Sequence, residues 1–218
     1  MKTSILTANQ KLFLEIVAND PFLSQQYYLS GGTALAEFYI PYRLSEDLDF
    51  FSEDEVDNQA ITVFINHNKV VLGFDEIGSS VHYNRNLFFL KYKDDILKTE
   101  FTYFPFQQIE KPKVINGVKI DSVIDIAVNK VFTIYQKPRL RDFYDLYMIV
   151  EKYGFVFKNL LKLARIKFDW TIDPLQMGTQ LLRVNELEDE PKLINKITVD
   201  WKKYFTKLAK DLKSDILQ

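Results

Sequence analysis

The stretch YLSGGTALAEFYIPYRLSEDLDFF, residues 28–51, decides how the rest of the chain is interpreted. It joins a short apolar run to the pair Gly31 and Gly32, then to a helical run, and then to a second apolar run that contains Asp47 and Asp49. The whole chain has only seven glycines, so two adjacent ones before a helical run need an explanation. The order of these features predicts a strand, a Gly-Gly turn, a helix and an acidic strand.

Asp47 and Asp49 lie on one face of the expected strand, because side chains in a strand alternate between faces with a period of two. Two carboxylates this close repel each other unless a cation lies between them. Mg²⁺ is usually held by one or two carboxylates together with the phosphates of a substrate, so the pair predicts a site for Mg²⁺ or Mn²⁺. A purely structural pair would instead need a basic partner such as Arg43 or Arg85.

A later run, ILKTEFTY at residues 96–103, repeats the alternation and has Glu100 on its polar face. If the apolar faces of both strands cover the same core, Glu100 lies on the side of Asp47 and Asp49. Three carboxylates on one face could hold two metal ions about 4 Å apart, the arrangement used for in-line phosphoryl or nucleotidyl transfer. Glu100 is therefore the expected third metal ligand.

The glycine pair predicts an anion site beside this metal site. A Gly-rich turn that leads into a helix lets backbone N–H groups approach a phosphate closely, and the helix dipole adds to the attraction. Thr33, directly after the pair, can add a hydroxyl donor. Turn, acidic strand and later acidic strand together favour a protein that binds a nucleotide and its metal ions.

The distribution of periodic runs predicts an α+β fold. Strand-like runs lie in the first half of the chain, and one helix there is expected to begin with Ser52 as its N-cap. Three runs between residues 121 and 168 have a helical period, and a lysine-rich helix ends the chain. We therefore expect a sheet domain over residues 1–115 and a helical domain over residues 116–218.

Composition limits the class of protein. Hydrophobic residues make up 47% of the 218 residues, which is typical of a globular chain. The absence of cysteine excludes disulfides and thiolate metal sites and suits the cytoplasm. No window approaches the roughly 18 consecutive apolar residues of a membrane span. The net charge of −2 argues against a general nucleic-acid coat, although the lysine-rich end could be either an RNA-binding surface or a solvated helix face.

Residues 31–51 resemble the signature of the AbiEii-like nucleotidyltransferases, a branch of the DNA polymerase β superfamily. That signature runs Gly-Gly-Thr-Ala-Leu, then Arg-x-Ser-x-Asp-x-Asp-Phe, and its second part is matched by Arg43, Ser45, Asp47, Asp49 and Phe50. A second family block, a lysine on a helix followed by Arg-Asp-x-x-Asp-Leu, is matched by Lys130 and by RDFYDL at residues 141–146. The two blocks bracket nearly the whole catalytic core, and the resemblance weakens toward the C-terminus.

The resemblance implies a polymerase-β-like nucleotidyltransferase sheet domain followed by a helical C-terminal domain. Toxin members of the family work in type IV toxin–antitoxin systems and transfer nucleotides from an NTP, in characterised relatives onto the acceptor ends of tRNA. The implied substrates are therefore an NTP and an RNA acceptor, with a protein or a small molecule as the alternative acceptor. The implied partner is a cognate antitoxin that acts as a transcriptional regulator.

The resemblance also implies roles for individual residues. Asp47 and Asp49 would be metal ligands, and Asp142 or Asp145 would be a further catalytic acid. The polymerase-β pattern usually has a third aspartate on a later strand, where this chain offers Glu100. The residues that would bind the nucleotide are Gly31, Gly32, Thr33, Arg43, Ser45 and, at the triphosphate, Lys130.

The sequence also allows purely structural roles for the residues of the second block. Lys130 could be a lysine that extends from an apolar helix to solvent. Asp142 could be only an N-cap, and Asp145 could pair with Arg139 or Arg141 on the same helix.

Two other functions also stay open. One is a catalytically degenerate relative that binds a nucleotide or a partner protein. The other is a D-x-D glycosyltransferase, which explains the metal pair but neither Gly-Gly-Thr nor RDFYDL.

Overall fold

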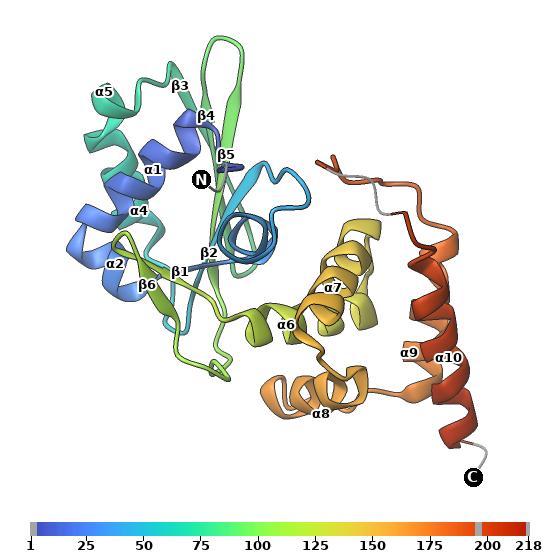
Figure 1. The fold of residues 1–218 in the computed structure, drawn as a ribbon. Coiled ribbons are helices and arrows are strands. Elements are labelled where there is room, and N and C mark those ends of the chain that lie inside the picture. The colour runs from blue at the N-terminus through green and yellow to red at the C-terminus, as the bar shows by residue number, and fades with distance from the viewer. Residues whose placement is uncertain (1–3, 195–197, 217–218) are drawn as a thin grey trace. The chain divides into compact units, whose positions relative to one another are not determined.

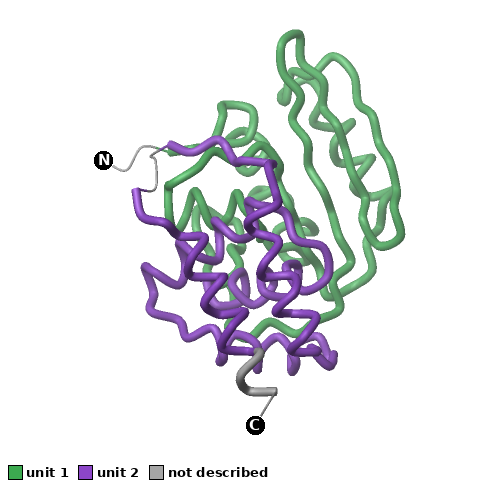
Figure 2. The backbone as a smooth tube through the Cα atoms, turned by 90° about the vertical axis from the view of Figure 1, so that its right-hand side faces the viewer, with its two compact units in different colours: residues 1–122 green, residues 123–218 purple. Residues whose placement is uncertain are grey.

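The computed structural model describes residues 4–194 and 198–216 (Figure 1). The chain divides into two compact units, residues 1–122 and 123–218 (Figure 2). Every strand of the described ranges belongs to unit 1, and unit 2 is helical. The predicted α+β fold, with a sheet first and helices after it, is confirmed. The unit boundary follows Ser122, whereas the predicted domain boundary lies at residue 115.

Unit 1 is built on one seven-stranded sheet. Its strands, in their order across the sheet, are β3 (Glu76–His82), β4 (Arg85–Lys91), β5 (Ile96–Tyr103), β2 (Asp47–Ser52), β1 (Tyr28–Ser30), β7 (Val118–Ile120) and β6 (Lys113–Ile115). The pairs β2–β5 and β1–β7 are parallel, and the other neighbours are antiparallel. Because β2 and β5 lie side by side in the centre, the two acidic runs of the sequence become neighbours.

The apolar face of β2 and β5 forms the core of unit 1. Phe50 and Phe101 lie in register and stack with ring centroids 4.9 Å apart. Phe13 of α1 contacts Phe50 at 6.2 Å and Phe64 of α4 at 6.3 Å, and all four rings are buried. Helices therefore cover one face of the central strands, and the acidic residues occupy the opposite face.

Three of the helices described in unit 1 begin at a side-chain cap, which Thr7, Asp20 or Asp57 supplies. The helices of this unit are α1 (Ala8–Asn19), α2 (Pro21–Gln26), α3 (Gly31–Ala34) with the π-helical turn η1 (Leu35–Tyr39), α4 (Asn58–His67) and α5 (Lys69–Leu72). The expectation that Ser52 caps α4 is wrong: Ser52 is the last residue of β2, and the Asp57 carboxylate accepts from the Ala60 N–H at 2.9 Å. Both residues are favourable caps, and pairing with β5 keeps Ser52 in the strand.

The regular elements in the described part of unit 2 are helices. Its helices are α6 (Val123–Gln136), α7 (Leu140–Tyr153), α8 (Phe157–Lys167), α9 (Pro174–Leu182) with the 3₁₀ turn η2 (Arg183–Asn185), and α10 (Lys202–Ile216). Aromatic pairs close its core: Phe143 on α7 meets Phe205 on α10 at 4.9 Å, and Phe132 on α6 stacks on Phe168 at 3.9 Å. In residues 4–194 and 198–216 no helix is both long and apolar enough to cross a membrane.

Candidate active site

The predicted metal-binding pair lies on the polar face of β2. Asp47 and Asp49 are half-buried, whereas Leu48 between them is fully buried. Asp49 lies beside Glu100 of β5 and beside Ser30 of β1 in the strand register. Neighbours in register point to the same face of a sheet. Glu100 therefore shares the face of the aspartate pair, as the alternation predicted.

The Gly31–Gly32 turn begins directly after β1 and reaches this acidic face. Gly31 has a φ of +70°, and a Cβ at that position would lie 2.6 Å from Oδ2 of Asp49. A Cβ on Gly32 would collide with Nη2 of Arg43. A Cβ at either position would therefore displace a charged side chain, and at Gly31 the left-handed backbone also favours glycine. The turn therefore lies beside the carboxylate that the sequence predicts to bind metal.

Replacing Gly31 by alanine is expected to lower the free energy of unfolding by about 1–2 kcal/mol, because a left-handed φ is strained for alanine. The new methyl group would also displace Asp49. Gly73 is the matched control: its φ is also +70°, but a Cβ there has nothing within 4 Å. Chemical denaturation should show similar losses in both variants, and Mn²⁺ binding should weaken only in Gly31→Ala. Equal Mn²⁺ binding in the two variants would contradict the contact with Asp49.

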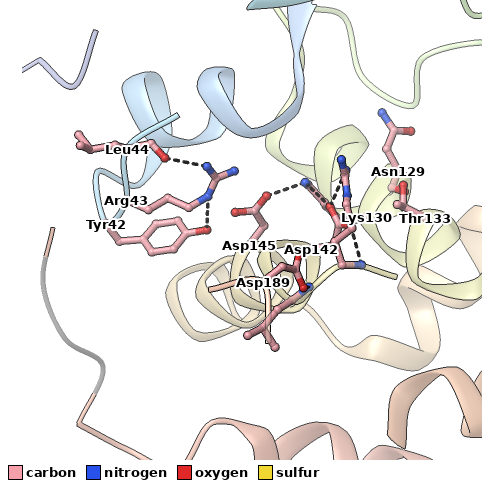
Figure 3. A network of polar contacts seen from close by, with 11 residues as sticks. Tyr42, Arg43, Leu44, Asn129, Lys130, Thr133, Asp142, Asp145 and Asp189 are labelled. Carbon is pink, nitrogen blue, oxygen red and sulfur yellow. Dashed lines mark hydrogen bonds and ion pairs between the residues drawn. The ribbon is translucent and has the colours of Figure 1, made fainter. Parts of the chain in front are cut away.

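Arg43 organises the loop between the helix and β2. Its side chain is buried, and it donates from Nε to the Tyr42 hydroxyl at 3.1 Å and from Nη1 to the Leu44 carbonyl at 2.9 Å (Figure 3). The hydroxyl of Ser45 lies 3.2 Å from the position that a Cβ on Gly32 would take. Arg43 and Ser45 therefore border the glycine turn, where the family signature placed them.

Thr33 uses its hydroxyl inside unit 1. The residue is fully buried, and its Oγ1 donates to the backbone carbonyl of Asp47. This bond ties the start of α3 to the start of β2. The hydroxyl that the sequence predicted to contact the nucleotide is therefore used to hold the glycine turn against the acidic strand.

Gln10 supports the same loop and was not singled out from the sequence. Its buried amide donates to the carbonyls of Ser45 and Glu46, both at 3.0 Å. Its Oε1 accepts from the backbone N–H of Thr7 at 2.9 Å, as half of the capping box that starts α1. The Thr-x-x-Gln spacing signals the cap, but nothing in the sequence signals the bonds to the loop.

Two basic side chains lie on the acidic face. Lys98 Nζ is 2.8 Å from Oδ2 of Asp47. Arg85 on β4 binds the Glu100 carboxylate with two hydrogen bonds, from Nε to Oε1 at 2.6 Å and from Nη2 to Oε2 at 2.5 Å. The Thr102 hydroxyl also donates to Oε1, at 2.7 Å. Burial alone would raise the pKa of Glu100, but the hydrogen bonds from Arg85 and Thr102 outweigh it and hold that pKa below its usual value.

The donors on this face suit a site built on two carboxylates. The residues described by the structure contain no group of three or more acidic or histidine side chains placed to hold one ion. Mg²⁺ needs only one or two protein carboxylates when substrate phosphates supply other ligands. Asp47 and Asp49, which share a face and are partly exposed, meet that requirement.

In unit 2 the second predicted block forms an ion cluster. Lys130 Nζ lies 2.8 Å from Oδ1 of Asp142 and 2.6 Å from Oδ2 of Asp145 (Figure 3). Both carboxylates are fully buried, and 9% of the Lys130 side chain is exposed. Lys130 is thus not a lysine that extends into solvent. Asp145 pairs with Lys130, which the sequence had not suggested.

Asp142 has a capping role as well. Arg139, not Asp142, is the N-cap of α7; Asp142 is the third helical residue, and its Oδ2 accepts from the Arg139 N–H at 3.2 Å and from Arg139 Nε at 3.1 Å. Burial would raise the pKa of Asp142, but the positive charges of Lys130 and Arg139 hold it below its ordinary value. Asp142 therefore joins α6 to the start of α7.

The depressed pKa of Asp142 gives stability a definite dependence on pH. A group whose pKa is lower in the folded state contributes stability above its unfolded pKa and loses it as pH falls through the folded pKa. We expect the free energy of unfolding to decrease between about pH 5 and pH 3, and to decrease less steeply in Asp142→Asn. Urea denaturation at several pH values measures both slopes, and parallel slopes would contradict the assigned ionisation.

The predicted site residues therefore form two groups. In unit 1, the glycine turn, its loop and the acidic strands bring together Gly31, Gly32, Thr33, Arg43, Ser45, Asp47, Asp49 and Glu100. In unit 2, Lys130 joins Asp142 and Asp145. Each group is connected by its own contacts.

Comparison with known families gives one match over nearly the whole chain. The sequence model described as "Nucleotidyl transferase AbiEii toxin, Type IV TA system" matches residues 12–217. Among curated proteins, an uncharacterized protein of Aquifex aeolicus (strain VF5) is 30% identical over 148 residues, which are 67% of this chain and 68% of that protein.

Two solved structures from Helicobacter pylori share the fold. The crystal structure of JHP933 has a TM-score of 0.60 and 21% identity, and the similarity covers 95% of this chain and 91% of that one. A second structure from the same organism has the same TM-score and identity over 98% and 99% of the two chains. The likeness shows that this fold extends along nearly the whole length of the compared chains.

Proposed function

Because the chain belongs to the AbiEii nucleotidyltransferase toxin family, we propose that it moves a nucleoside monophosphate from an NTP to RNA with the help of Mg²⁺. The observation that carries the proposal is the close approach of the Gly31–Gly32 turn to Asp49. A phosphate-binding backbone and a metal-binding carboxylate thereby occupy one site. The proposed acceptor is tRNA, as the resemblance implied.

The biological role follows from the family. We propose that the chain is the toxin of a type IV toxin–antitoxin pair and that it acts in the cytoplasm, where NTP and tRNA are present. Its proposed partner is a cognate antitoxin that is also a transcriptional regulator. Growth arrest after induction of the wild type, and normal growth after induction of Asp49→Asn, would support the toxin role.

Asp47 and Asp49 would hold Mg²⁺ or Mn²⁺ between the polar face of β2 and the phosphates of the NTP. Such an ion lowers the pKa of an attacking hydroxyl and offsets charge at the reacting phosphate. When no divalent ion is present, the Lys98 ammonium at 2.8 Å from Asp47 offsets one of the two negative charges of the carboxylate pair. Its second role would be to contact a phosphate once Asp47 binds metal.

The rest of the unit 1 site would position the triphosphate. The backbone N–H groups of Gly31 and Gly32 would bind phosphate oxygens, the hydroxyl of Ser45 lies beside Gly32, and Arg43 holds the loop through the Leu44 carbonyl. Within unit 2, Lys130 uses two of the three N–H donors of its ammonium on aspartates, and the third is available to a ligand. The role of this lysine in binding triphosphate is proposed from the family resemblance alone. Asp142 and Asp145 orient that ammonium and are the proposed additional acids.

The proposed reaction is an in-line displacement at the α-phosphorus. The hydroxyl oxygen of the acceptor forms a bond to this phosphorus as the bond to the bridging α–β oxygen breaks. The hydroxyl proton passes to solvent, and pyrophosphate leaves with both of its phosphorus atoms from the NTP.

The position of a radioactive label in the NTP tests this chemistry. Total RNA should gain ³²P from NTPs labelled at the α-phosphate and none from NTPs labelled at the γ-phosphate. Label from the γ-phosphate would instead indicate phosphoryl transfer and contradict the proposal. An intact affinity for NTP without any transfer would identify the chain as a degenerate nucleotide-binding relative.

A further inference from the structure

Glu100 has its carboxylate engaged by the protein itself. Arg85 binds both oxygens, Thr102 binds Oε1 as well, and 6% of the Glu100 side chain is exposed. A metal ion at this carboxylate would have to compete with a bidentate guanidinium at 2.5–2.6 Å. Fork-shaped pairs of this kind are among the strongest charge-assisted contacts in proteins. The position of Glu100 beside Asp49 is therefore not enough to make it a metal ligand.

Arg85 is anchored at one side of its guanidinium and exposed at the other. Its side chain is 52% exposed, although Glu100 holds two of its N–H groups. A guanidinium has five N–H donors, so three remain. Arg85 lies opposite Thr102 in the β4–β5 register, and Thr102 and Glu100 are on the same face as Asp49. The remaining donors are therefore presented on the acidic face.

The charges around the aspartate pair indicate that Arg85 would bind a phosphate only together with a divalent cation. The aspartate pair, its register neighbour Glu100 and their ion-pair partners make up three carboxylates, Asp47, Asp49 and Glu100, and two cations, Lys98 and Arg85. One negative charge is left over, which disfavours a phosphate. A divalent cation on the aspartate pair changes the sum to one positive charge, so metal and phosphate would bind together.

We propose that Arg85 is a phosphate-binding residue of this site and that Glu100 positions it instead of holding metal. The inference rests on the proposed function, because it takes Asp47 and Asp49 as the metal ligands. An arginine whose rotamer is already fixed by a buried carboxylate loses little freedom on binding, which makes it a favourable partner for an oxyanion. The phosphate belongs either to the NTP or to the RNA acceptor.

A measurement of metal affinity distinguishes Asp49, the proposed metal ligand, from Glu100, which is proposed only to position Arg85. Mn²⁺ alone is titrated by electron paramagnetic resonance into the wild type, Asp49→Asn and Glu100→Gln. Removing a ligand should weaken Mn²⁺ binding about tenfold or more in Asp49→Asn. Glu100→Gln should stay close to the wild type. If Glu100→Gln loses Mn²⁺ as fully as Asp49→Asn does, Glu100 is a metal ligand and the proposal is overturned.

Phosphate binding is measured by calorimetry in the presence of Mg²⁺. The probes are the α,β-imido analogues of the four NTPs and, separately, a purified tRNA mixture. Arg85→Gln should bind one of these about 10- to 100-fold more weakly, the loss expected for charge-assisted hydrogen bonds. A loss for the analogues assigns the phosphate to the NTP, and a loss for tRNA alone assigns it to the acceptor. Arg85→Lys, which keeps the charge without the fork, should recover part of the affinity.

Lys91→Gln is the matched control on the same strand. Lys91 is 51% exposed and pairs with Glu76 at 3.2 Å on β3, far along β4 from Arg85. Its replacement should leave both affinities unchanged. Wild-type affinity of Arg85→Gln for both probes would overturn the proposal. A wild type that binds neither Mn²⁺ nor any analogue would instead overturn the proposed function itself, and this inference with it.

Discussion

The Asp49→Asn variant is expected to fold normally and to lose nucleotidyl transfer. Asparagine has nearly the shape of aspartate, so the close approach of Gly31 is kept while one negative charge is removed. Charge stabilisation by a metal site is worth several kcal/mol at the transition state, which corresponds to a rate reduction of about a thousandfold. The initial rate of label incorporation from α-³²P NTP at saturating RNA measures this effect.

A control variant shows whether the loss of activity comes from the site itself or from the removal of any surface negative charge. Asp94 lies in the exposed turn between β4 and β5, so Asp94→Asn removes the same charge outside the site. It should retain the rate of the wild type. Thermal melting checks that Asp49→Asn is folded. A folded Asp49→Asn that transfers label as fast as Asp94→Asn would exclude Asp49 from the site.

Replacing Lys130 by methionine is expected to destabilise the protein by about 3–5 kcal/mol, because the change leaves carboxylates buried without their cation. Asp142 and Asp145 are both fully buried and within 2.8 Å of the Lys130 ammonium. Arg139 still compensates Asp142, so Asp145 bears most of the cost. Urea denaturation of the wild type and the variant gives the difference directly.

Two further variants show that the loss comes from uncompensated charge. Adding Asp145→Asn to Lys130→Met removes the buried carboxylate that has lost its cation, and it should restore a large part of the stability. Lys203→Met breaks an exposed pair with Asp200, in which the lysine side chain is 82% exposed, and should change stability little. If Lys130→Met costs no more than Lys203→Met, the cluster does not stabilise unit 2.

The sequence predicted the parts of the site that depend on local pattern. The period of two placed Asp47, Asp49 and Glu100 on one face, and the β2–β5 register confirms it. The glycine pair predicted a tight turn, and the φ of Gly31 and the close approach to Asp49 give the physical reason for it. These predictions needed only the alternation of a strand and the conformational range of glycine.

Long-range pairing could not be predicted in the same way. The partners of Asp47 and Glu100 depend on which strands become neighbours. The sequence offered Arg85 as a partner of the aspartate pair, whereas the structure pairs it with Glu100 and pairs Asp47 with Lys98. The link from Lys130 to Asp145 has the same cause, since α6 and α7 must first pack together.

Some elements were missed although local signals exist. The β6–β7 hairpin turns at Asn116 and Gly117, both with positive φ, which is the favoured chemistry of a two-residue hairpin. Helix α9 begins with the Asp173 cap followed by Pro174. Strand β3 has no such signal: its residues are mostly exposed, and pairing with β4 defines it.

The central claim is nucleotidyl transfer at Asp47 and Asp49, and one labelling experiment tests it most directly. Wild type and Asp49→Ala are incubated with total RNA, Mg²⁺ and each α-³²P NTP in turn, and the RNA is separated on a denaturing gel. We expect a labelled band at the size of tRNA with the wild type for at least one NTP, and none with Asp49→Ala. A band of equal intensity with Asp49→Ala, or no labelled RNA with any NTP, would contradict the account.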